Sequence, residues 1–168
     1  SSDLGVVDVK IKDGGKHYDG SLSIYSGDYA SKASNIYPNI DNLSMTANRT
    51  FDGFISGPVL PFLGDFLTFN VSIRRSESEG YLFGIREHNP DDLAYFPPSG
   101  NWYIQMRGDS AFVPMNPSES TNSLAKFTLR LSPRLKISTQ SILSQSQRKS
   151  YSHEYKYNPD GVGSKLSD

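Results

Sequence analysis

Residues 67–73 read Leu-Thr-Phe-Asn-Val-Ser-Ile, and this stretch decides the fold class. Apolar side chains occupy every second position, and small polar side chains fill the positions between them. Successive side chains of a β-strand point to opposite faces, so the alternation predicts a strand with one face on a core and the other in water.

The same alternation recurs along the chain, which indicates a protein built from short strands. It is seen at residues 7–11, 22–24, 81–85, 102–106, 127–131 and 135–137. No window of 11 or more residues carries a stripe with the helical period of 3.6. Glycine-containing turns such as Asp13-Gly14-Gly15 separate the runs, and the prolines at 58 and 61 make residues 59–62 an edge or a corner. We expect an all-β, antiparallel β-sandwich, immunoglobulin-like or jelly-roll, with about seven to nine short strands and little or no helix.

The composition changes near the C-terminal end, and this suggests a division of the chain. Residues 1–143 are expected to form a single β-sandwich domain, and residues 144–168 a segment rich in Ser, Gln and Tyr. Within that segment we predict a loop at 144–150, a last strand at 152–157 and a frayed tail from Val162 onwards.

The composition excludes several kinds of protein. The 168 residues include 17 Lys and Arg against 18 Asp and Glu, 26 Ser and no Cys. Without cysteine there is neither a disulfide scaffold nor a thiolate metal site, and the balanced charge argues against a nucleic-acid partner. No apolar run is long enough for a membrane span, and no signal-peptide pattern is present. We interpret the many serines as residues of the solvent-exposed face of a sheet.

The loop from Glu87 to Asn101 is long for a connection between strands, and it predicts a binding site. Aromatic faces stack on sugar rings, and Asp and Asn side chains hydrogen-bond to sugar hydroxyls. Both kinds of side chain gather here, and the expected ligand-binding residues are Asp91, Asp92, Tyr95, Phe96, Asn101, Trp102 and Tyr103. The alternative is that the aromatic residues are core anchors and the two aspartates form a solvated turn.

A tripeptide typical of integrin ligands follows at Arg107, Gly108 and Asp109. If residues 102–106 pair with residues 111–113, Gly108 and Asp109 lie at the tip of a hairpin. The alternative is an ordinary turn, because Gly-Asp is a common turn dipeptide.

No catalytic or metal-binding pattern is evident. The three histidines, His17, His88 and His153, are widely spaced, and no Gly-x-Ser-x-Gly elbow occurs. The carboxylate pairs Glu77/Glu79 and Asp91/Asp92 fit charged turns. We expect no catalytic residue, no metal and no cofactor, and therefore not an enzyme.

Residues Tyr18 to Tyr25, which read Tyr-Asp-Gly-Ser-Leu-Ser-Ile-Tyr, resemble an early strand of the cysteine-free, K88-like subunits of bacterial chaperone–usher fimbriae. The resemblance implies an incomplete immunoglobulin-like fold completed by strand pairing with a periplasmic chaperone or a neighbouring pilus subunit. It also implies export to the cell surface. The terminal pattern of a pilin is absent, since Tyr155 and Ser167 stand where that family has Gly and Tyr. This departure points to the receptor-binding domain of a tip adhesin.

Taken together, these features suggest a secreted or surface-displayed binding module, an adhesin domain that recognises a host glycan or cell-surface receptor. Two alternatives remain open at this point. One is a structural subunit of a fimbria or capsid, and the other is a carbohydrate-active enzyme on a jelly roll.

Overall fold

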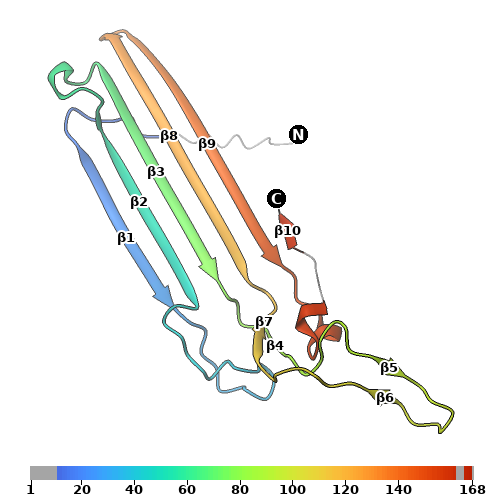
Figure 1. The fold of residues 1–168 in the computed structure, drawn as a ribbon. Coiled ribbons are helices and arrows are strands. Elements are labelled where there is room, and N and C mark those ends of the chain that lie inside the picture. The colour runs from blue at the N-terminus through green and yellow to red at the C-terminus, as the bar shows by residue number, and fades with distance from the viewer. Residues whose placement is uncertain (1–10, 162–164, 168) are drawn as a thin grey trace, which may run out of the picture. The chain divides into compact units, whose positions relative to one another are not determined.

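The computed structural model describes residues 11–161 and 165–167, and this part of the chain is all-β (Figure 1). The long strands are β1 (Asp19–Gly27), β2 (Asn48–Pro58), β3 (Leu67–Ser78), β8 (Ser118–Ser132) and β9 (Leu135–Lys149). The short strands are β4 (Phe83–Ile85), β5 (Ala94–Tyr95), β6 (Tyr103–Ile104), β7 (Phe112–Pro114) and β10 (Lys165–Ser167). Three single turns of 3₁₀-helix, η1 (Pro61–Leu63), η2 (His153–Tyr155) and η3 (Pro159–Gly161), are the only helical elements of the described residues.

The strands form antiparallel sheets, which confirms the predicted fold class at this level. The main sheet has the order β1-β2-β3-β8-β9-β10, and two small sheets pair β4 with β7 and β5 with β6. Within the described ranges, no helix is long and apolar enough to cross a membrane.

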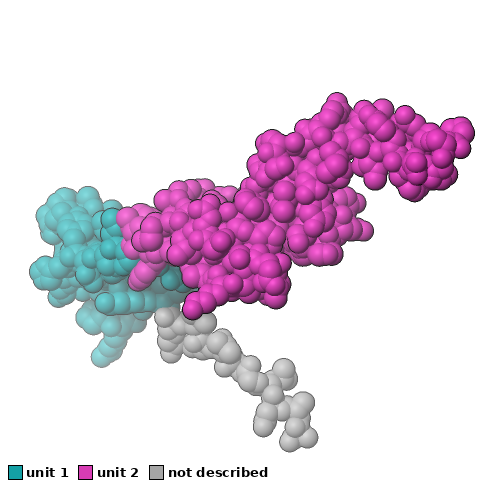
Figure 2. Space-filling view, turned by 90° about the horizontal axis from the view of Figure 1, so that it is seen from below, with its two compact units in different colours: residues 1–23, 52–74, 122–144 teal, residues 24–51, 75–121, 145–168 magenta. Residues whose placement is uncertain are grey.

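The chain divides into two compact units (Figure 2). Unit 1 comprises residues 1–23, 52–74 and 122–144, and unit 2 comprises residues 24–51, 75–121 and 145–168. The long strands β1, β2, β3, β8 and β9 each contribute residues to both units. The small sheets belong to unit 2.

Most of the strands predicted from alternation are present. The runs at 22–24, 67–73, 127–131 and 135–137 lie in β1, β3, β8 and β9, and the runs at 81–85 and 102–106 contain the shorter β4 and β6. Residues 59–62 form the predicted corner, with η1 beginning at Pro61. In the run at 7–11, residues 7–10 lie outside the described residues, and Ile11 is not in a strand.

The C-terminal predictions were wrong at three places. Residues 144–149 continue β9 and do not form a loop, and Lys149 and Arg148 pair with Lys165 and Leu166 of β10. Residues 152–157 contain η2 in place of a strand, because the amide of Tyr155 bonds to the carbonyl of Ser152. Lys165–Ser167 pair with β9 as β10, where a frayed tail was expected, and residues 162–164 and 168 of that expected tail lie outside the described residues.

In the central strands, the most deeply buried side chains are polar and not apolar. Thr68 and Thr128 are fully buried and Asn70 is nearly so, whereas Ile73 and Phe127 are exposed. The apolar residues of β3 and β8 therefore do not form the buried face that the alternation predicted. The interpretation of small polar residues as the wet face fails for these strands.

A segment of unit 1 that precedes β1 provides partners for two of these polar side chains. The carbonyl of Lys12 accepts a bond from the amide of Asn70 at 3.2 Å, and Asp13 accepts one from the hydroxyl of Thr128 at 3.3 Å. A side chain at Gly14 would overlap the backbone of Phe69, so the segment lies close against β3. The buried side chains of Asn70 and Thr128 find polar partners in this segment, whereas the buried hydroxyl of Thr68 has no hydrogen-bond partner.

Among the residues that the structure describes, parts of the main sheet expose apolar side chains on both faces. Ile142 and Leu143 are neighbours on β9 within unit 1, so their side chains point to opposite faces. Their exposed fractions are 63% and 68%. Ile24 and Tyr25 of β1 show the same arrangement in unit 2, since both are exposed.

Candidate functional site

A hairpin of unit 2, residues 93–106, is the most exposed concentration of aromatic side chains that the structure describes. Its strands β5 and β6 pair antiparallel, with Ala94 opposite Ile104 and Tyr95 opposite Tyr103. Figure 1 shows the hairpin extending away from β4 and β7 of the same unit. The loop that the sequence singled out is therefore a protruding arm.

Proline and glycine shape the tip of this arm. The amide of Gly100 bonds to the carbonyl of Pro97 at 3.0 Å, which closes a turn around Pro98 and Ser99. Proline fixes the backbone at the first central position of such a turn. Gly100 has a φ of 85°, a value that glycine adopts without strain.

Four aromatic rings form two contacts across the arm. The ring centroids of Tyr95 and Tyr103 are 5.0 Å apart, and those of Phe96 and Trp102 are 5.3 Å apart. All four rings remain exposed, Trp102 by 67%. The rings support one another and leave their outer surfaces open to a target.

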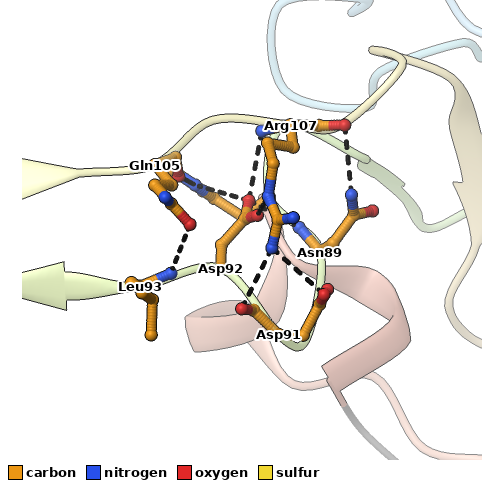
Figure 3. A network of polar contacts seen from close by, with 7 residues as sticks. Asn89, Asp91, Asp92, Leu93, Gln105 and Arg107 are labelled. Atoms are coloured by element: carbon orange, nitrogen blue, oxygen red, sulfur yellow. Dashed lines mark hydrogen bonds and ion pairs between the residues drawn. The ribbon is translucent and has the colours of Figure 1, made fainter.

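The base of the hairpin is held by a clamp of charged residues (Figure 3). The Arg107 guanidinium donates to Asp92 at 2.6 Å and to Asp91 at 3.1 Å. The backbone amides of Asn89 and Arg107 also donate to Asp92, at 2.9 and 3.1 Å. Beside the clamp, the amide of Leu93 donates to the side-chain oxygen of Gln105 at 3.0 Å.

Asp92 is the centre of this clamp. Its side chain is only 6% exposed, whereas that of Asp91 is 77% exposed. Burial raises the pKa of Asp92, but the amides of Asn89 and Arg107 and the Arg107 guanidinium outweigh burial and hold the pKa below its usual value. Asp92 therefore stays ionised and fixes the two strands of the hairpin to each other.

The predicted ligand-binding residues take two different roles in this arrangement. Tyr95, Phe96, Asn101, Trp102 and Tyr103 are exposed on the arm, so the aromatic residues do not act as core anchors. Asp91 and Asp92 lie at its base, where both bind Arg107.

Three further exposed apolar residues of the same arm were not among the predicted site residues: Leu93, Ile104 and Met106. The signal that marks them is the lack of charge. From 93 to 106 the chain contains no Asp, Glu, Lys, Arg or His.

The integrin-like tripeptide does not lie at a hairpin tip, and that part of the prediction was wrong. Strand β6 pairs with β5, and β7 pairs with β4, so residues 102–106 and 111–113 are not partners. Arg107 belongs to the clamp, and Asp109 accepts bonds from Arg86 and from the amide of Ala111. The amide of Gly108 bonds to the carbonyl of Glu87, and a side chain there would overlap the backbone of Arg86.

A cavity of about 250 Å³ also lies in unit 2. Its lining includes Arg49, Glu77 and Glu119. Glu77 pairs with Arg49 and Arg75, and Arg75 also pairs with Glu119, so these charges satisfy one another. Within the described part of the chain, no group of three or more His, Asp or Glu side chains is placed to hold a metal ion.

Comparison of the chain with models of protein families, with curated proteins and with solved structures finds no match.

Proposed function

We propose that this protein is a binding module that attaches to a target surface through the exposed aromatic hairpin at residues 93–106. The observation that carries the proposal is the pair of exposed ring contacts held in place by the Asp92–Arg107 clamp. Rigid aromatic side chains provide a large contact area at little cost in conformational entropy. An arm whose base is already fixed loses less freedom on binding.

This geometry suits the adhesin role expected from the sequence, with a host glycan or cell-surface receptor as the target. The exposed rings offer stacking surfaces, and Asn101 is the polar side chain near them that is free of the clamp. We assign the attachment role to Tyr95, Phe96, Trp102 and Tyr103, with Asp91 and Asp92 as positioning residues. Secretion or surface display, and the relation to fimbrial subunits, belong to the same proposal.

Attachment of the labelled protein to cultured cells and to immobilised glycans tests this function. The double variant Phe96→Ala/Trp102→Ala is expected to lose most of the attachment. The matched control Leu43→Ala removes an exposed apolar residue elsewhere in unit 2 and is expected to attach normally. Equal attachment by all three proteins would refute the proposal.

A second candidate function, a structural subunit of an assembly, is favoured by the main sheet. Strand β1 is at the edge of the sheet order and contains no Lys or Pro, the residues that commonly block strand pairing at an edge. Ile142 and Leu143 are exposed on opposite faces of β9 and offer apolar contacts to a neighbour. In such an assembly, a neighbouring subunit packed against this sheet would complete the β-sandwich expected from the sequence.

A further inference from the structure

The stretch from Leu93 to Met106 differs from the rest of the chain in having no charged side chain. Charged residues make up 21% of the sequence, so about three would be expected in 14 residues. Half of these 14 residues are large, apolar or aromatic and exposed: Leu93, Tyr95, Phe96, Trp102, Tyr103, Ile104 and Met106. Exposure of such an apolar arm to water is unfavourable. This indicates that another molecule or a membrane covers the arm when the protein functions.

The apolar surface surrounds the arm and is not confined to one side. Tyr95 and Tyr103 are opposite each other across the two strands, so their side chains share a face. Ala94 and Ile104 form the adjacent pair, which points to the other face, and Ile104 is also exposed. A sugar ring stacks on one face of an aromatic platform, whereas a medium that encloses the arm covers both faces.

The chemistry of the side chains fits the boundary between lipid and water. Trp and Tyr have an apolar ring and one polar group, and they concentrate at the level of lipid headgroups. A sugar site needs converging polar groups, but Asp91 and Asp92 are already bound to Arg107. A membrane interface requires no such partners.

The charged clamp limits how deeply the arm can enter a membrane. From Leu93 to Pro97, where the turn at the tip begins, four residue steps span about 13 Å at about 3.3 Å per residue. This is close to the hydrocarbon layer of one leaflet, about 15 Å, and much shorter than a whole bilayer. Asp91 and Asp92 precede β5 and Arg107 follows β6, where the uncharged stretch ends.

We propose that the hairpin Leu93–Met106 inserts into the interfacial zone of one leaflet of a lipid bilayer. This inference rests on the proposed function, attachment through the arm, and names the lipid of the target cell's membrane in place of a glycan as what the arm binds. The open backbone edges of a two-stranded hairpin keep it in the hydrated headgroup region, since unpaired backbone groups are costly in hydrocarbon. The arm carries no charge, so binding does not require anionic lipid.

Trp102 provides the test, because it is the only Trp of the chain and lies on the arm. The full-length protein is mixed with vesicles of phosphatidylcholine, and its Trp emission and its co-sedimentation are measured. Insertion is expected to shift the emission to shorter wavelength. Lipids brominated near the headgroup are expected to quench it more strongly than lipids brominated near the chain end. Raising the salt concentration is expected to leave the binding nearly unchanged.

Two variants locate the contact. Phe96→Asp keeps Trp102 as the probe and places a charge on the arm, and it is expected to weaken vesicle binding by about tenfold or more. Leu43→Asp introduces the same charge at another exposed position of unit 2 and is expected to bind like the parent protein. Circular dichroism confirms that both variants are folded.

Three outcomes contradict the inference. The first is that vesicles produce neither a shift nor co-sedimentation, and the second is that Phe96→Asp binds vesicles as well as the parent. The third is that soluble oligosaccharides change the Trp102 emission while plain vesicles do not, which assigns the arm to a glycan. In the first and third cases the proposed function stands if Phe96→Asp still reduces attachment to cells. The proposed function fails as well only if Phe96→Asp attaches to cells as strongly as the parent protein does.

Discussion

Asp92 and Asp91 are neighbours with very different surroundings, and this contrast gives a matched pair of variants. Asp92→Asn removes the charge that Arg107 and two backbone amides share, so we expect the arm to loosen. Asp91→Asn affects a carboxylate that is 77% exposed and should have little effect. The mobility of the arm is measured by the fluorescence anisotropy of Trp102 and by the rate of protease cleavage within residues 93–106. Anisotropy is expected to fall and cleavage to rise several-fold in Asp92→Asn alone.

Asp13 makes the stability of unit 1 depend on pH. Hydrogen bonds from the ammonium groups of Lys126 and Lys136, at 2.7 and 2.8 Å, hold the pKa of Asp13 well below its ordinary value. The depressed pKa means that the folded state favours the ionised form. The stabilisation is fully present above the ordinary Asp pKa of about 3.9 and is lost as the pH falls below it.

Urea unfolding at pH 7 and at pH 3 tests this dependence in the parent protein and in Asp13→Asn. At pH 7 the variant is expected to be less stable by about 1 kcal/mol, a modest value for a carboxylate with charged hydrogen-bond partners near the surface. At pH 3 the difference between the two proteins should shrink. If the free energies of unfolding of the two proteins differed equally at pH 7 and at pH 3, Asp13 would not stabilise the fold through its charge.

We expect a substitution in the integrin-like tripeptide to have no effect on cell attachment. Asp109 binds Arg86 and the amide of Ala111, and Arg107 binds the clamp, so both ends of the motif are already paired and are not presented together on a hairpin tip. Asp109→Glu is therefore expected to leave the attachment of integrin-bearing cells unchanged. Loss of attachment in this variant, with normal attachment of Phe96→Asp, would assign the contact to the tripeptide.

At the scale of elements, alternation identified strands but not the side that is buried. The pattern in residues 67–73 locates β3 correctly, because period-2 alternation is a local property of the chain. Which face is covered depends on the segment at Lys12–Gly14, which binds Asn70 and Thr128 from far away in sequence. No local pattern contains that information.

Strands made of polar residues, and contacts between residues far apart in the sequence, cannot be predicted from local patterns for the same reason. The end of β9, residues 144–149, has no apolar side chain, and it is a strand because β9 pairs with β8 on one side and with β10 on the other. The aromatic residues of the candidate site could be named from the sequence. The bond between Asp92 and Arg107 joins residues 15 apart, so the role of Asp92 required the structure.

The hairpin is expected to be dispensable for folding. Its large side chains are exposed, and its contacts with the rest of unit 2 are concentrated at the base. Replacing residues 95–103 by a short Gly-Ser linker should change the free energy of unfolding by less than about 1 kcal/mol, since exposed positions contribute little. Chemical denaturation measures this change, and the same variant should lose attachment completely. A large loss of stability would instead make the arm part of the core.

For the whole molecule, the main question is what covers the apolar residues of the main sheet. The only large hydrophobic side chains that are fully or nearly fully buried in the described residues are Ile40 and Met115, both in unit 2. In unit 1, Ile142 and Leu143 are exposed on opposite faces of one strand. Burial of such residues is the main driving force of association, so we expect the protein to self-associate as its concentration rises.

Sedimentation equilibrium over a range of concentrations measures this association. The double variant Ile142→Lys/Leu143→Lys is expected to weaken it by about tenfold or more, because two apolar contacts become charged. Ser141→Lys adds a charge at an exposed polar position of the same strand and should have a much smaller effect. If the parent protein remains monomeric at the highest concentration, self-assembly through this sheet is excluded. The structural-subunit function would then require a different chain as the partner, and the binding-module function would gain support.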